Sequence, residues 1–216
     1  MLHYNRSIPL KYTPVTIMNN KPTKGTYLET LLRSQQTIFS IQDVALLWGE
    51  ADEKKISLRL NKYVRKGALI KVRRGLYAKD KDFDYLELAT RIYTPAYISF
   101  ETVLTRAGIN FQFYGNIFVA SYINREIMVG EQKITFVRTK DYVLSNTTGI
   151  DHSSGYATAT PERAFLDRVY VSKEYHFDNL TNLNWDKVFE YAPIYHNKRL
   201  EKKVRTYYKS YQDSIH

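Results

Sequence analysis

The chain has 216 residues, of which 44% are hydrophobic and 25% are charged, so it is long enough for one large domain or two small ones with ordinary cores. It contains no cysteine, which excludes disulfides, thiolate metal sites and cysteine nucleophiles. No stretch is apolar enough for a membrane span or a signal peptide, so we expect a cytoplasmic protein with no membrane partner.

The formal net charge of +10 is distributed unevenly along the chain. Residues 51–80 hold ten basic and three acidic side chains, and residues 187–209 hold seven basic and two acidic ones. Residues 81–186 hold ten basic and thirteen acidic side chains. The sequence therefore predicts a basic module, a near-neutral body and a basic C-terminal segment, with a polyanion as the partner of the first module.

The first 80 residues divide into an arm and a module. Residues 1–25 contain several prolines and asparagines, which predicts an extended arm or a short edge strand. Leucines at helical spacing then predict a first helix over residues 27–34. Ser40 is a good N-cap for a second helix, which Gly49 ends.

A third helix is predicted over residues 53–66, with apolar residues on one side and basic residues on the other. Two short strands follow, over residues 68–72 and 76–78, and Gly75 allows the positive φ that a tight hairpin between them requires. Three helices followed by a basic hairpin is the order of a winged helix-turn-helix. We therefore expect residues 26–80 to be a DNA-binding domain of this class.

The third helix of such a domain enters the major groove of double-stranded DNA, and a basic hairpin suits phosphates or a narrow minor groove. The side chains expected to contact DNA lie on the polar face of that helix and at the hairpin tip: Lys54, Lys55, Ser57, Leu58, Asn61, Lys62, Arg65, Arg73 and Arg74. Asn61 has the chemistry for a bidentate contact to adenine, and Leu58 either touches a thymine methyl or packs beside the hairpin. Many operators are inverted repeats that two copies of a module bind, which favours a homodimer on DNA. The alternative is a winged helix that binds only proteins.

Residues 81–216 combine helical and strand patterns. Helices are predicted near residues 83–93 and 100–107, the second of them with Ser99 as its N-cap. The period then changes to two, and the pair Thr160-Pro161 later opens another helix. The predicted strands cover residues 117–122, 125–130, 134–137 and 156–159, and two last helices lie near residues 184–195 and 197–211. This order predicts an α+β domain with a small sheet and C-terminal helices.

Patterns typical of catalysis are weak. Glu131-Gln132-Lys133 matches the Glu-x-Lys half of a nuclease metal site, but residues 85–130 contain no aspartate to complete it, so alternating exposed charges are the favoured interpretation. The five histidines are scattered without metal-ligand spacing, and no glycine-rich phosphate loop occurs. We expect no enzyme, no catalytic residue, no metal and no cofactor.

The last predicted helix interleaves basic and aromatic residues. Its basic side chains include Lys198, Arg199, Lys202, Lys203 and Arg205. The favoured interpretation is a surface helix that packs by its aromatic side. The alternatives are a docking surface for an acidic protein partner and a secondary contact to DNA.

Three segments carry a resemblance to a known family. They are "RRGLYA" at residues 73–78, "YISFETVLTRAGI" at residues 97–109 and "ATPERAFLDRVYV" at residues 159–171. In this order the chain resembles the antitoxins of AbiE-type abortive-infection systems, a type IV toxin–antitoxin class, over about residues 27–171. The resemblance implies a protein that represses its own operon by binding its promoter and counteracts a nucleotidyltransferase-type toxin. It implies a genetic partner more firmly than a physical one, because neutralisation in this class is thought not to require a stable complex.

Polar positions inside the matched segments are the candidates for an antitoxin surface: Ser99, Glu101, Arg163 and Asp167. The alternative is that these residues only begin helices or form surface ion pairs. Of the functions from other classes, the second-ranked is a stand-alone transcriptional regulator whose C-terminal domain senses a ligand or oligomerises. A DNA-cutting enzyme ranks third.

Overall fold

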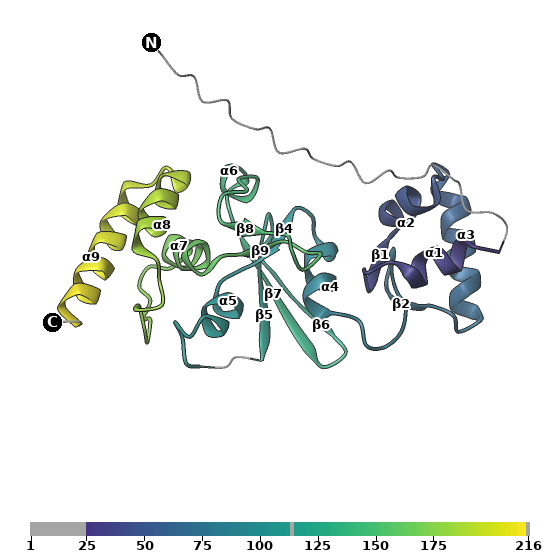
Figure 1. The fold of residues 1–216 in the computed structure, drawn as a ribbon, viewed down its shortest axis with the longest axis horizontal. Coiled ribbons are helices and arrows are strands. Elements are labelled where there is room, and N and C mark those ends of the chain that lie inside the picture. The colour runs from purple at the N-terminus through teal and green to yellow at the C-terminus, as the bar shows by residue number, and fades with distance from the viewer. Residues whose placement is uncertain (1–24, 113–114, 215–216) are drawn as a thin grey trace, which may run out of the picture.

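The computed structural model describes residues 25–112 and 115–214. Helices and strands are mixed along this part of the chain, which confirms the α+β class. The predicted arm over residues 1–25 lies outside the described residues, except for Gly25. The larger sheet of the described residues has six strands. Figure 1 shows this sheet between two helical ends, with α1 to α3 at one end and α8 and α9 at the other.

Residues 26–78 form what we call the N-terminal unit. Its elements are α1 (Tyr27–Arg33), β1 (Ile38–Ser40), α2 (Ile41–Trp48), α3 (Glu53–Arg65), β2 (Ile70–Arg73) and β3 (Leu76–Ala78). The strands make an antiparallel sheet in the order β1-β3-β2, in which Ala78 lies opposite both Ile38 and Ile70. The helices predicted in this region are confirmed to within a residue or two. Strand β1 was not predicted.

Local interactions fix the ends of α2 and α3. The Ser40 side chain accepts the backbone N–H of Asp43, which confirms the predicted N-cap, and the Asp43 carboxylate accepts the N–H of Ser40 in return. Gly49 ends α2 in the left-handed conformation with φ 58°. The Asp52 side chain caps α3.

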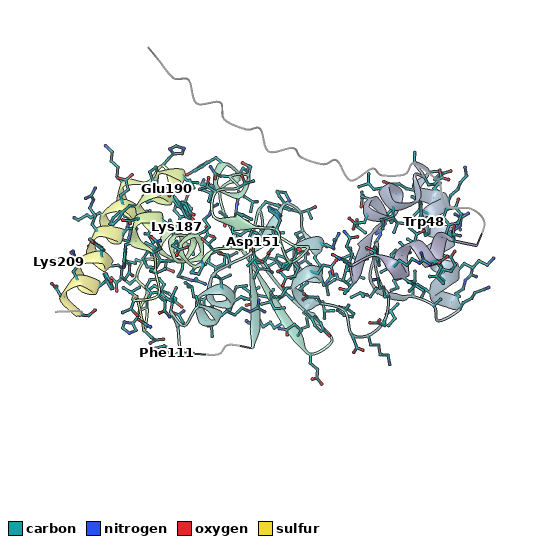
Figure 2. All side chains as sticks on the ribbon, viewed as in Figure 1. Trp48, Phe111, Asp151, Lys187, Glu190 and Lys209 are labelled. Carbon is teal, nitrogen blue, oxygen red and sulfur yellow. The ribbon has the colours of Figure 1, made fainter. Side chains whose placement is uncertain are left out.

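The core of the N-terminal unit surrounds Trp48, which Figure 2 labels among these helices. Its indole N–H donates to the carbonyl of Tyr27 at 3.0 Å, and its ring meets the Tyr27 ring edge-on. Ile56 and Leu60 bring the inner face of α3 into the same core. The outer face of α3 is therefore held toward solvent.

Residues 81–112 and 115–214, which we call the second region, are built on a mixed sheet in the order β6-β7-β5-β4-β9-β8. Its strands are β4 (Ala96–Ile98), β5 (Asn116–Ser121), β6 (Arg125–Val129), β7 (Gln132–Arg138), β8 (Ile150–Asp151) and β9 (Thr158–Ala159). Its helices are α4 (Tyr85–Ile92), α5 (Glu101–Arg106), α6 (Asp141–Leu144), α7 (Pro161–Val171), α8 (Trp185–Tyr191), the 3-10 turn η1 (Ala192–Tyr195) and α9 (Lys198–Ser214). The sheet is larger than predicted, because the short strand β4 joins it through partners distant in sequence and the two-residue strand β8 pairs with the nearby β9.

The N-terminal unit packs through its sheet against α4. Buried Ile38, Leu76 and Ala78 share a small core with Leu88 of α4. The Glu87 carboxylate accepts the backbone N–H and the hydroxyl of Thr37 at 2.8 and 2.6 Å. Arg91 donates to Asp43 at 2.5 Å. These contacts leave α3 on the side of the unit that faces away from the six-stranded sheet (Figure 1).

Candidate nucleic-acid interface

Helix α3 presents a cationic face to solvent. Lys54, Lys55, Lys62 and Arg65 are exposed, as the sequence predicts. Leu58 lies among them and is 70% exposed, so it does not pack beside the hairpin. Ionised lysine and arginine side chains on an exposed helix can bind phosphates without a large desolvation cost.

The remaining polar residues of α3 are held more firmly. Arg59 lies over the Tyr27 ring, with its guanidinium carbon 3.6 Å from the ring centroid, so its charge is tied to α1. Ser57 and Asn61 are half-buried, and the Asn61 amide nitrogen donates to the Ser57 hydroxyl at 3.4 Å. A base contact by Asn61 therefore competes with a weak hydrogen bond inside the helix.

An acidic cap lies at the start of α3. The Asp52 carboxylate accepts the backbone N–H groups of Lys54 and Lys55 at 3.0 and 3.2 Å. The backbone hydrogen bond from Lys55 and the Lys55 ammonium group lower the pKa of Asp52, which keeps the carboxylate ionised. Asp52 thus occupies the anion position of this helix end and leaves the outward-facing lysines as the groups that can bind DNA.

The hairpin between β2 and β3 is tight, and Gly75 adopts the expected positive φ, at 78°. Arg74 is exposed and Arg73 is half-buried. Both arginines line a cavity of about 360 Å³ together with Arg91 and Tyr93, at the end of α4. The predicted hairpin cations are therefore next to the second region.

The four residues expected to form an antitoxin surface do not form one. Ser99, Glu101, Arg163 and Asp167 are 0%, 6%, 0% and 1% exposed. Ser99 also does not cap α5, since the N-cap position is Phe100, at φ 54°, without a side-chain cap hydrogen bond. The surface expectation is wrong because these polar groups bond to one another inside the protein, where a buried charge must be paired.

Asp167 is the acceptor at the centre of a buried cluster that joins the second and third matched segments, residues 97–109 and 159–171. The hydroxyls of Ser99 and Tyr195 each donate to its carboxylate at 2.7 Å, and Tyr97 donates at 3.1 Å. Burial raises the pKa of Asp167, while the charge of Arg163 and the three hydroxyl donors oppose that shift. Burial and the Asp167 charge raise the pKa values of Tyr97 and Tyr195, so both tyrosines remain neutral donors.

Arg163 supplies the positive charge of this cluster. Its Nη1 donates to the Thr148 carbonyl at 2.8 Å, and its Nη2 donates to the Val143 carbonyl at 2.7 Å and to the Tyr97 hydroxyl at 3.2 Å. Its Nε lies 3.6 Å from Asp167. Burial alone would lower the pKa of Arg163, but the neighbouring Tyr195, Asp167 and Tyr97 raise it, so the guanidinium stays charged.

A second buried pair lies beside the first. Glu101 forms an ion pair with Arg168 and accepts the Tyr175 hydroxyl at 2.9 Å. The Arg168 guanidinium packs over the rings of Phe100 and Tyr175, at 4.8 and 5.2 Å from their centroids. The Asp167 cluster ties Tyr97 of β4 and the following Ser99 to α7, and the Glu101–Arg168 pair ties α5 to α7, so these motif residues hold the second region together.

Helix α9 is cationic outside and aromatic inside. Lys198, Lys202, Arg205 and Lys209 are exposed and lie four, three and four residues apart, which places them on one face. On the opposite face Tyr207, Tyr208 and Tyr211 pack against the second region, which confirms the expected packing by the aromatic side. Figure 2 labels Lys209 near the end of α9, at the opposite end of the molecule from α3.

Glu131 lies in the turn before β7, and Gln132 and Lys133 are the first two residues of that strand. Lys133 pairs with Glu126 of the neighbouring strand at 2.9 Å, and the two side chains are 41% and 58% exposed. Across residues 25–112 and 115–214, no three histidine or acidic side chains are grouped so that they could hold a metal ion. None of the described helices has the length and apolar character needed to cross a membrane.

Sequence reasoning missed Tyr97, Tyr195 and the carbonyls that complete the buried cluster. Tyr97 lies inside a matched motif, so the motif itself was a signal for it, whereas Tyr195 is distant in sequence from its partners. In comparisons with known proteins, no family model and no curated sequence matches the chain.

Proposed function

We propose that the N-terminal unit is a winged helix-turn-helix that binds double-stranded DNA through α3. The observation that carries the proposal is the exposed cationic face of α3, backed by Ile56 and Leu60 in the core, within the order helix, strand, helix, helix, hairpin. In such a domain the third helix lies in the major groove. Lys54, Lys55 and Lys62 would bind phosphates or base edges there.

A selection experiment tests this proposal. The full chain is incubated with a pool of random double-stranded oligonucleotides at about physiological ionic strength, and bound sequences are amplified over several rounds. We expect enrichment of one short motif, repeated with inverted symmetry if two copies bind. A pool without enrichment, or equal retention of single-stranded oligonucleotides, would contradict the proposal.

Leu58 offers a test of base reading that is separate from charge. We expect Leu58→Ala to change the free energy of unfolding by less than about 0.5 kcal/mol, because the side chain is largely exposed. The same change should weaken binding to the selected sequence by about fivefold, through loss of an apolar contact worth about 1 kcal/mol. Fluorescence anisotropy with selected and random duplexes measures both affinities. An unchanged preference for the selected duplex would remove Leu58 from the interface.

The second part of the proposed function follows from the resemblance to AbiE-type antitoxins. We propose that the protein represses its own operon and counteracts a nucleotidyltransferase-type toxin encoded beside it. Ser99, Glu101, Arg163 and Asp167 are buried, so they contribute to an antitoxin role only by stabilising the fold. An antitoxin surface must instead be exposed, and the exposed face of α9 with Lys202, Arg205 and Lys209 suits an acidic partner surface.

Growth of cells that express the adjacent gene tests the antitoxin role. We expect the full chain to restore growth, and we expect the triple variant Lys202→Ala, Arg205→Ala, Lys209→Ala to fail to do so. The matched control is Lys54→Ala, Lys55→Ala, Lys62→Ala, which removes the same charge from α3 and should still restore growth. If the adjacent gene is harmless, the protein is a regulator without an antitoxin role. If both variants restore growth, the α9 assignment is wrong.

A further inference from the structure

A cavity of about 550 Å³ lies between the segment that leads into α4 and the helix α5. We call it the α4–α5 cavity. Its walls include Phe83 and Tyr85 before and at the start of α4, Arg106 at the end of α5, Gln132 of β7 and Tyr156. This volume lies within the range of about 300–1,000 Å³ that is typical of small-molecule sites.

Aromatic rings form one part of the cavity wall. The rings of Phe83 and Tyr85 lie 4.8 Å apart at 51°. Tyr156 adds a third ring from the loop that precedes β9. Three half-buried aromatic rings around one space favour a planar ligand, because stacking and edge contacts add to the free energy of burial.

Only a few polar side chains of the cavity lining are available to a ligand, and their neighbours limit which atoms they can offer. Burial raises the pKa of Tyr156, and the nearby side chains of Asp84 and Arg106 act on it in opposite directions, so a carboxylate and a guanidinium lie close to this phenol. The Gln132 amide nitrogen donates to the carbonyls of Gly115 and Lys133 at 2.8 and 3.0 Å, so its amide oxygen is the atom that it offers to a ligand. Arg106 is exposed at the cavity and presents guanidinium donors. The cavity can therefore both accept and donate hydrogen bonds.

The charges of the lining nearly cancel. Arg106 opposes Asp84, and Glu101 is compensated by Arg168 behind the wall. A highly charged ligand such as a triphosphate would not find a matching charge here. A neutral ligand with a polar edge fits the lining better.

We propose that the α4–α5 cavity binds a neutral nucleoside, with its base among the three aromatic rings. The Gln132 amide oxygen would accept a hydrogen bond from an exocyclic amino group of the base. Arg106 would donate to a ring nitrogen, a carbonyl or a ribose hydroxyl. The aromatic walls then supply affinity, and the two side chains supply selectivity.

The α4–α5 cavity borders the contact between α4 and the N-terminal unit, so a bound ligand can affect DNA binding by that unit. This part of the inference rests on the proposed DNA binding. The backbone N–H of Asp84 donates to the Thr37 hydroxyl at 3.0 Å, and Thr37 in turn donates to Glu87. Phe83 and Tyr85 flank this same contact. A nucleoside in the cavity would therefore touch the segment that fixes the N-terminal unit on α4, and its binding would shift the affinity for DNA.

The test begins without DNA. Adenosine, guanosine, cytidine and uridine are each titrated into the full chain, and binding is measured by isothermal titration calorimetry. We expect saturable binding with one site per chain for a nucleoside with an exocyclic amine, and weaker binding for uridine, which has none. If none of the four nucleosides binds, or if uridine binds as tightly as the others, the proposal is overturned.

Variants locate the site. Gln132→Leu should weaken nucleoside binding at least about tenfold, because it removes the acceptor and leaves the amino group of the base unpaired. The matched control is Gln212→Leu on α9, where the side chain is exposed and far from the cavity. If Gln132→Leu lowers the melting temperature, Arg106→Gln replaces it, since Arg106 is exposed and outside the core. Wild-type affinity in the folded cavity variant would overturn the assignment.

A final titration separates this inference from the proposed function. The affinity for the selected duplex is measured with and without saturating nucleoside. We expect a shift that Gln132→Leu abolishes. Nucleoside binding without any shift keeps the site and overturns the coupling, while a chain that binds nucleoside but no DNA overturns the proposed function alone.

Discussion

Replacing Lys54, Lys55 and Lys62 by alanine is expected to weaken binding to the selected duplex by about 100-fold, which corresponds to about 1 kcal/mol for each contact removed. All three side chains are exposed on the outer face of α3, so their loss leaves the core around Ile56 and Leu60 intact. The salt dependence should change with the affinity. Each phosphate contact contributes about 0.9 to the slope of log affinity against log salt, so the slope should fall by up to about three.

The matched control removes the same charge from the other end of the molecule. Lys202→Ala, Arg205→Ala, Lys209→Ala should change the affinity for DNA far less, because α9 lies at the end opposite α3 (Figure 1). Fluorescence anisotropy at several salt concentrations gives affinities and slopes for both variants. Equal losses for the two variants would mean that net charge, rather than α3, determines binding. A larger loss for the α9 variant would move the interface to α9.

Much of the N-terminal unit could be predicted because its signals are local. Ser40, Gly49 and Gly75 fix helix ends and a turn through interactions within a few residues, and each behaves as the sequence predicts. The exposed face of α3 follows from helical periodicity alone, including the unusual exposure of Leu58. Strand β1 could not be predicted, because a strand of three residues exists only through its pairing with β3.

The buried clusters could not be predicted for a different reason. Arginine and aspartate are usually exposed, so the sequence alone predicts that Arg163 and Asp167 lie at the surface. Their spacing of four residues on one helix is typical of an exposed ion pair as well as a buried one. The pair can be buried because Tyr195 and the carbonyls of Val143 and Thr148 form hydrogen bonds with it. The fold brings these partners from other parts of the chain.

The α4–α5 cavity also lies beyond sequence reasoning. Its lining combines residues before α4, at the end of α5, in β7 and before β9. Each of these residues has an ordinary local role, as when Asp84 caps α4. Only the packing of α4 against the sheet gathers Phe83, Tyr85 and Tyr156 around one space.

We expect Arg163→Met to destabilise the protein by about 3–5 kcal/mol, because it leaves the Asp167 carboxylate buried without its positive partner. That loss is a large share of the roughly 5–15 kcal/mol by which domains are usually stable. At about 2–4 °C for each kcal/mol, the melting temperature should fall by about 6–20 °C. Arg138→Met is the matched control and should change stability by less than about 0.5 kcal/mol, since Arg138 is exposed at the end of β7.

The double variant Arg163→Met, Asp167→Leu tests whether the two charges act as a pair. Removing both charges should cost less than the sum of the single changes, since neither ion is then left buried alone. Additive losses, measured by thermal and denaturant unfolding, would contradict the pairing.

The growth assay with the adjacent gene separates the structural role of Arg163 from a direct role in antitoxin action. Below its melting temperature, Arg163→Met should still protect cells, because the side chain is fully buried and the exposed face of α9 is unchanged. Loss of protection in a folded Arg163→Met protein would instead give this buried arginine a direct role in antitoxin action.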